Sequence, residues 1–289
     1  MKTKKKSVGT KAKIRALKEG EKRIATAIFL ALILLIVAFS VYFTYTFLNQ
    51  PQNQTINPAS TSESPQSKAA IVDQLSLTSP NQTFVQTATN TLEQAGYKVD
   101  YYAGEEVDVE FYRNLPTHGY GLIILRVHSS AAELQGKEFM ETPVGIFTSE
   151  SYSQTKYVYE QLTDQLVSAS YTMPQPPFYF GIVPKFVTSS MKGTFQDTII
   201  IMMGCEGLNN TKMAEAFIQK GAKTYIGWKG SVLASHTDLA TVHLLQHFVI
   251  EKQTLKTAIN ETMQEVGPDP VYNSLLAYYP PKAEYIYLK

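Results

Sequence analysis

Two residues whose side chains can do covalent chemistry follow two apolar segments of the chain. His128 directly follows GLIILRV at 121–127, and Cys205, the only cysteine, follows TIIIMM at 198–203 and Gly204. A thiolate is a competent nucleophile, and a nearby imidazole can take the thiol proton and later protonate a leaving amine. The carboxyl ends of parallel strands meet at one edge of a sheet, so the two segments predict a His–Cys dyad.

The residues beside this pair predict the donors of an oxyanion hole. Gly204 lets the backbone turn sharply and approach a substrate closely. The backbone N–H of Cys205, with one from the Ser129 region, is expected to face a developing oxyanion. The alternative for Cys205 is a structural thiol, since free cysteine is among the most buried residue types, and His128 taken alone fits a hydrogen-bonded core histidine.

Strand and helix patterns alternate from about Ala69 to Lys289, around the two candidate residues. Besides the two segments above, strands are predicted at 69–75, 97–103 and 223–228, with a late edge strand at 284–288, and helices at 80–96, 105–115, 211–220, 235–250 and 254–266. Alternating strands and helices predict an α/β fold, a three-layer α/β/α sandwich with a mostly parallel central sheet. Chemistry in such a fold gathers beyond the carboxyl ends of the strands.

Several segments, in this order, resemble clan CD cysteine peptidases, the caspase, gingipain and clostripain relatives, and above all CHAT domains. They are GLIILRVHSS, DTIIIMMGCEG, and MAEAFIQKGAKTYIGWKGSV followed by HTDLATVHLLQHFV. The match covers roughly Gly121 to Glu251, and its most specific part is the order of Gly221-Ala222, Trp228 and Asp238 after the cysteine. The resemblance implies a caspase-like fold and thiol-dependent endopeptidase activity without a metal or organic cofactor. It makes His128 the general base and Cys205 the nucleophile.

The chain departs from the pattern of these peptidases near the dyad. Ser129 occupies the place after the histidine where they usually have Gly, which puts one oxyanion donor in doubt. Met203 stands where many members carry an acidic residue that helps to bind a basic P1 side chain. Gly204 and Glu206 replace the Ala and the basic residue of caspases, so a caspase-like preference for Asp at P1 is not expected.

Three further residues are candidates for lining the substrate pocket: Trp228, Asp238 and Glu206. Trp228 fits a pocket wall and a core residue equally well, because aromatic side chains dominate both settings. Asp238 has the charge to bind a basic side chain, although an acidic residue in the first turn of a helix more often stabilises the helix end.

A different chemistry is suggested by His236, His243 and His247, which lie on one side of the helix predicted at 235–250. His243 and His247 have the i, i+4 spacing of metal ligands. The segment HLLQH lacks the glutamate of the zinc-hydrolase helix, so a catalytic zinc is not expected. A structural or adventitious metal site is the alternative to a solvated helix face, and we assign no metal from the sequence.

The first 68 residues predict a membrane anchor. Residues 1–23 carry ten Lys and Arg against two Glu, a net charge of +8, and residues 24–48 contain no charged side chain. About 20 apolar residues suffice to span a bilayer, and the cations before the span predict a cytoplasmic N-terminus. A cleaved signal peptide is the alternative, but no small-x-small site closely follows the span. Residues 49–68, rich in Asn, Gln, Pro, Ser and Thr, predict a flexible tether to an extracytoplasmic domain at 69–289.

The charge balance limits the function classes. The whole chain carries +1, so the part after residue 23 carries −7, which argues against a nucleic-acid partner. We expect a single-pass protein of the cell membrane, a cysteine endopeptidase that acts on extracytoplasmic proteins or peptides. The alternative is a catalytically inactive member of the same fold that serves as a surface binding or scaffolding module.

Overall fold

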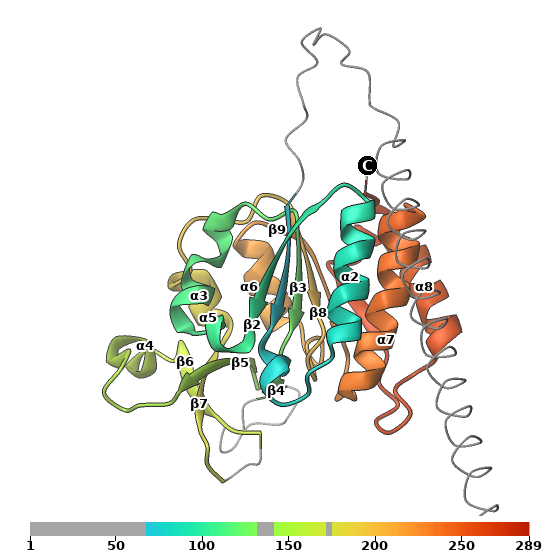
Figure 1. Ribbon diagram of the computed structural model, residues 1–289. Coiled ribbons are helices and arrows are strands. Elements are labelled where there is room, and N and C mark those ends of the chain that lie inside the picture. Colours follow the sequence, from blue (N-terminus) through green and yellow to red (C-terminus); the bar gives the residue numbers. More distant parts are fainter. Residues whose placement is uncertain (1–67, 132–141, 172–174, 289) are drawn as a thin grey trace, which may run out of the picture. The chain divides into compact units, whose positions relative to one another are not determined.

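A six-stranded sheet forms the centre of the structure, a computed structural model that describes residues 68–131, 142–171 and 175–288 (Figure 1). In the order of the sheet the strands are β10 (Leu276–Tyr279), β9 (Ala222–Trp228), β8 (Thr198–Met202), β3 (Leu122–Arg126), β1 (Lys68–Asp73) and β2 (Lys98–Ala103). All neighbouring strands are parallel except β10, which runs antiparallel to β9. The prediction of an α/β fold with a mostly parallel central sheet is confirmed.

Continuous apolar runs account for the two central strands. Every residue of β3 and of β8 is buried, as expected for strands covered on both faces. Successive side chains point to opposite faces, so Leu122 and Ile124 pack into one apolar cluster while Ile123 and Leu125 pack into the other.

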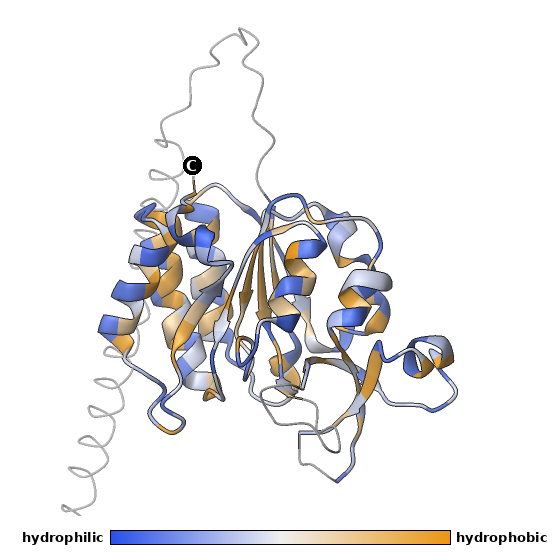
Figure 2. Cartoon of the chain, turned by 180° about the vertical axis from the view of Figure 1, so that it is seen from behind, coloured by the Kyte–Doolittle hydropathy of each residue, from blue (hydrophilic) through white to orange (hydrophobic). Residues whose placement is uncertain are grey.

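Helices cover both faces of this sheet. On one face lie α2 (Gln82–Gln94), α7 (Ala234–Leu245) and α8 (Leu255–Val266), and on the other α3 (Val109–Asn114), α5 (Pro184–Ser189) and α6 (Lys212–Gln219). Figure 2 shows the central strands as apolar throughout, whereas the helices carry polar and apolar stripes. The layers therefore follow from burying one stripe of each helix against the sheet.

Capping residues set the limits of two of these helices. The Asn81 side chain accepts a hydrogen bond from the Phe84 N–H (3.1 Å) at the start of α2, and the Thr254 hydroxyl accepts one from the Thr257 N–H (3.3 Å) at the start of α8. Gly267 follows α8 with φ +72°. The helix predicted at 235–250 is present but changes its winding, because α7 continues into a π-helical turn, η5 (Gln246–Ile250).

A second sheet lies between β3 and β8 in the chain, where the sequence showed no regular pattern. It is antiparallel, in the order β4 (Ser129–Ala131), β5 (Val144–Ser151), β7 (Tyr179–Ile182) and β6 (Leu166–Ala169), and a short helix, α4 (Val158–Leu162), precedes β6. Because β4 starts directly after His128, this residue occupies the junction between the two sheets.

Short 3-10 turns complete the described elements: η1 (Gln74–Leu77), η2 (Gly104–Glu106), η3 (Leu115–His118) and η6 (Pro281–Tyr285). The helix predicted at 105–115 is thus reduced to α3 with a 3-10 turn before and after it. The edge strand predicted at 284–288 is wrong. The edge strand is β10, which pairs with β9 and ends before Pro280, whereas Tyr285 is 72% exposed.

The anchor predicted at 24–48, the basic tail at 1–23 and the tether up to residue 67 lie outside the described residues. Among the helices of 68–131, 142–171 and 175–288, none combines the length and the apolar character needed to cross a bilayer.

Candidate functional site

Neighbouring strands carry the two candidate catalytic residues. Strands β3 and β8 pair in parallel from Leu122 with Ile199 to Leu125 with Met202. Each paired residue of β3 faces the residue of β8 that comes 77 positions later in the chain. The same 77 positions separate His128 from Cys205. The prediction that the two segments are parallel strands of one sheet is confirmed, and the structure adds that they are direct neighbours, so both residues follow strand ends at the same carboxyl edge.

The backbone after β8 closely approaches the end of β3. The Ser129 hydroxyl donates a hydrogen bond to the Cys205 carbonyl oxygen (2.5 Å). A Cβ atom on Gly204 would lie 2.3 Å from the Ser129 Oγ and 2.6 Å from the Val127 carbonyl oxygen. Glycine is therefore required at 204 for contact with the segment that follows β3, a reason that differs from the close approach to a substrate expected from the sequence.

The thiol of Cys205 points to the loop between β9 and α7. Its Sγ lies 3.5 Å from both the carbonyl oxygen and the backbone nitrogen of Val232, and the side chain packs beside the cluster of α2, α7 and α8. Burial raises the pKa of the thiol above its ordinary value, and the charges of Glu206 and Asp269 add to the effect, against the lowering by the Val232 hydrogen bond. At neutral pH Cys205 is therefore a protonated thiol.

The imidazole of His128 is held by residues that follow β1 and by aromatic rings. Its Nε2 lies 2.8 Å from the Thr78 hydroxyl, and its backbone N–H donates to the Gln74 side-chain oxygen (3.0 Å). The ring centroid is 4.4 Å from that of Tyr171, whose hydroxyl is hydrogen-bonded to the Gln74 amide. Burial, assisted by the charge of Arg126, lowers the pKa of His128 to about 4, so the imidazole is neutral and can accept a proton.

The described side chains of the dyad thus have separate partners. No hydrogen bond joins the Cys205 thiol to the His128 ring among the residues that the structure describes. Gln74 and Thr78 were missed by the sequence analysis because the strand pattern was extended to residue 75. Strand β1 ends at Asp73, so the strand-end rule that selected His128 also selects the residues that follow β1.

Asp238 belongs to a buried ion-pair network. Its two carboxylate oxygens accept hydrogen bonds from Nε and Nη2 of Arg126 (2.7 and 2.9 Å), while Nη1 donates to Asp73 (2.7 Å). The Arg126 side chain is fully buried. Helix α7 begins at Ala234 and has no acidic residue in its first turn, so Asp238 lies too far along the helix to stabilise its start. The sequence feature that could have indicated this network is Arg126, a charged residue inside the apolar strand segment at 121–127.

Glu206 and Trp228 are both buried and hydrogen-bonded. The Glu206 carboxylate accepts bonds from the Ala131 N–H (2.6 Å) and the Ser231 hydroxyl (3.2 Å), so it links β4 to the loop after β9. The Trp228 indole N–H donates to the Thr237 hydroxyl (2.9 Å), and the ring is 1% exposed. Trp228 thus packs in the apolar cluster that includes residues of α2, α7 and α8.

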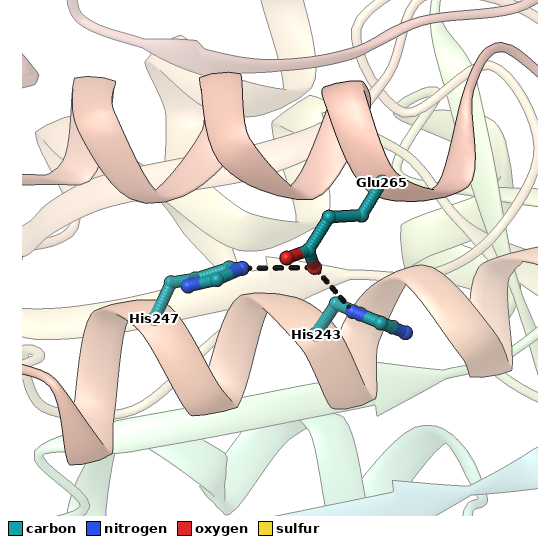
Figure 3. A group of neighbouring side chains, drawn as sticks. All are labelled: His243, His247 and Glu265. Atoms are coloured by element: carbon teal, nitrogen blue, oxygen red, sulfur yellow. Dashed lines mark hydrogen bonds and ion pairs between the residues drawn. The ribbon is translucent and has the colours of Figure 1, made fainter.

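The three histidines of the α7 region separate into two environments. His236 lies 5.4 Å from Trp228 between ring centroids, and its Nε2 is 3.2 Å from the Gly267 carbonyl oxygen. His243 and His247 instead face Glu265 on α8 (Figure 3).

No protein-family model and no curated protein matches the chain.

Proposed function

We propose that the protein is a membrane-anchored cysteine endopeptidase with a caspase-like domain, similar to CHAT domains, that acts on extracytoplasmic proteins or peptides. The observation that carries the proposal is the pairing of β3 with β8, which brings His128 and Cys205 to the carboxyl edges of adjacent strands with one common offset. The basic block at 1–23 and the uncharged segment at 24–48 support the location.

The reaction starts from two uncharged groups. Rotation of both side chains, from Val232 and from Thr78, is required to bring Sγ to the imidazole when a substrate binds. His128 then takes the thiol proton as Sγ attacks the carbonyl carbon, and backbone N–H groups near Cys205 stabilise the oxyanion. Collapse breaks the C–N bond, and the imidazolium gives its proton to the leaving amine. Water, activated by the neutral His128, hydrolyses the acyl-enzyme and regenerates the thiol.

A non-catalytic module of the same fold is the second candidate. The observation that favours it is the hydrogen bonding of both side chains to other groups, together with a raised pKa of the thiol. In that case the edge of the sheet binds a protein or peptide without cleaving it.

Peptide cleavage by the full-length protein in detergent distinguishes the two. The protein is incubated with a library of proteome-derived peptides under reducing conditions, and new peptide termini are identified by mass spectrometry. We expect Cys205→Ala to abolish cleavage and His128→Gln to slow it by about 10²- to 10⁴-fold, the usual contribution of a general base. His118→Gln is the matched control, because His118 lies in η3, before the amino end of β3, and its cleavage rate should equal that of the wild type.

Cleavage that survives in Cys205→Ala would refute the dyad. Binding of peptides by the wild type and by Cys205→Ala with equal affinity, and without any new termini, would establish the non-catalytic module.

A further inference from the structure

A cluster of imidazole and carboxylate groups lies between helices α7 and α8, apart from the His–Cys pair. His243 is in the last turn of α7, His247 is in the π-helical turn η5, and Glu265 is near the end of α8. Figure 3 shows the Glu265 carboxylate between the two rings, with one oxygen facing a nitrogen of each. π-Helical turns are rare and occur often at functional sites.

The three side chains present converging ligand atoms. The Glu265 Oε2 lies 2.5 Å from the Nδ1 of His243 and 3.0 Å from the Nε2 of His247, and one ligand atom of each residue lies within 4.8 Å of the others. Ligands of a tetrahedral metal at bond lengths of about 2.0–2.2 Å are about 3.3–3.6 Å apart. The two contacts of the Glu265 carboxylate therefore have to lengthen by about 1 Å or less for an ion to enter between the ligands.

The burial of the three residues permits this opening. The His247 side chain is 9% exposed and is fixed by its neighbours, whereas those of His243 and Glu265 are 37% and 45% exposed. One ligand is thus held in place while the other two are free to adjust.

The second nitrogen of His247 has the partner that a metal-bound imidazole requires. Its Nδ1 lies 3.0 Å from a carboxylate oxygen of Glu251 and 3.4 Å from one of Glu261. A ligating histidine usually donates its other ring N–H to a carboxylate, which fixes the tautomer and the ring orientation. Gln253 donates hydrogen bonds to both Glu251 and Glu261, so these carboxylates are themselves held.

We propose that His243, His247 and Glu265 bind a divalent transition-metal ion such as Zn²⁺, with Glu251 orienting His247. Two imidazole nitrogens and one carboxylate suit zinc and its neighbours better than Ca²⁺ or Mg²⁺, which take oxygen ligands. Three carboxylates surround two histidines here, so a divalent cation also offsets an excess of negative charge. The ion would join α8 to α7 and η5, and this binding is separate from peptide hydrolysis.

Metal titration of the full-length protein in detergent, stripped with a chelator, tests the site. Co²⁺ serves as the spectroscopic probe, because tetrahedral Co²⁺ with nitrogen ligands absorbs visible light, and Zn²⁺ displaces it. We expect one Co²⁺ per chain and a Tm that rises with free Zn²⁺. His243→Gln and Glu265→Gln, chosen because both side chains are partly exposed and their loss does not open the core, should lower the affinity by more than about 100-fold, and Glu251→Gln by about 10- to 100-fold.

His118→Gln, on the other face of the sheet, is the control and should bind Co²⁺ like the wild type. The proposal is overturned if the folded wild type takes up no Co²⁺, or if His243→Gln and Glu265→Gln keep wild-type affinity. Neither result depends on peptide cleavage, so the metal site and the peptidase can fail separately.

Discussion

Burial sets the protonation states of His128 and Cys205 in the same uncharged direction. The pKa of the imidazole falls to about 4, and that of the thiol rises. A preformed thiolate–imidazolium pair would need the opposite shifts. For the proposed peptidase, this arrangement is a resting state, and its activation requires movement of the two side chains.

The lowered pKa of His128 has a consequence for stability. The unfolded chain binds a proton at an ordinary histidine pKa of 6.5, whereas the folded protein binds it only near pH 4. Between these values the unfolded state carries more protons than the folded state. The contribution of His128 to the free energy of unfolding is therefore fully present above pH 6.5 and is lost as the pH falls toward 4, by about 3 kcal/mol in total. Urea unfolding at pH 7.5, 6 and 5 measures it, and His128→Gln should show a shallower pH dependence; an unchanged pH dependence would contradict the assignment.

Asp238 provides a test that separates an ion-pair partner from a pocket residue. Asp238→Asn leaves the buried guanidinium of Arg126 with Asp73 as its one carboxylate partner. Breaking a buried pair by removing one charge costs about 3–5 kcal/mol, so the midpoint of urea unfolding should fall clearly. Glu93→Gln, an exposed acidic residue of α2, is the control and should unfold like the wild type. A change in peptide preference at unchanged stability would instead favour the pocket.

At the scale of elements, the junction between β3 and β8 is set by contact between their carboxyl ends. The Ser129 hydroxyl holds the Cys205 carbonyl, Met203 donates its backbone N–H to the Leu125 carbonyl (2.9 Å), and Gly204 leaves no room for a side chain. The relative position of His128 and Cys205 thus depends on contacts between the strand ends as well as on the contacts of the two side chains.

Replacing Gly204 tests that dependence. In Gly204→Ala the new methyl group would overlap the Val127 carbonyl, so one strand end has to shift, and we expect a loss of about 1–3 kcal/mol, typical of overpacking. Gly121→Ala is the matched control, since its nearest neighbour, the Lys68 carbonyl oxygen, would lie 3.8 Å away. Thermal unfolding of both variants gives the comparison, and equal Tm values would show that the ends of β3 and β8 are not tightly packed.

The elements also show which parts of the fold could be predicted from the sequence. Strands β3 and β8 were predictable because both faces are buried, which produces unbroken apolar runs. The second sheet was not, because β4 has three residues and β6 four, with a mixed burial pattern. The Tyr-rich segment at 284–288 has strand propensity, but pairing with β9 decided the edge of the sheet in favour of β10.

The candidate site, too, could be predicted only in part from the sequence. His128 and Cys205 were identified by their positions after two strands, because the order of elements alone predicts which residues lie at the carboxyl edge of the sheet. The roles of Asp238 and Glu206 did not follow, since their partners Arg126 and Ala131 are 112 and 75 positions away and are found only by folding.

At the scale of the whole molecule, charge and hydropathy divide the chain into a basic tail of +8, an uncharged segment at 24–48 and an acidic remainder of −7. These patterns predict a protein held in the membrane by one span, with its C-terminal domain outside the cytoplasm.

Membrane fractions test this arrangement. Alkaline carbonate removes peripheral proteins, so the full-length chain should stay in the pellet, and a variant lacking 24–48 should appear in the supernatant. External protease applied to intact cells should remove an epitope tag at the C-terminus and spare one at the N-terminus. Recovery of the full-length chain in the supernatant, or protection of the C-terminal tag, would contradict the prediction.

The ion pairs of Arg126 also determine when this domain can be completed during synthesis. The guanidinium lies on β3, yet Asp238, one of its two carboxylate partners, is 112 residues further along the chain. A nascent chain that has not reached this residue of α7 cannot neutralise the Arg126 charge as the finished domain does. The complete ion-pair network of Arg126 therefore cannot form until Asp238 has left the ribosome, so the segments made earlier emerge before the domain can reach its native packing.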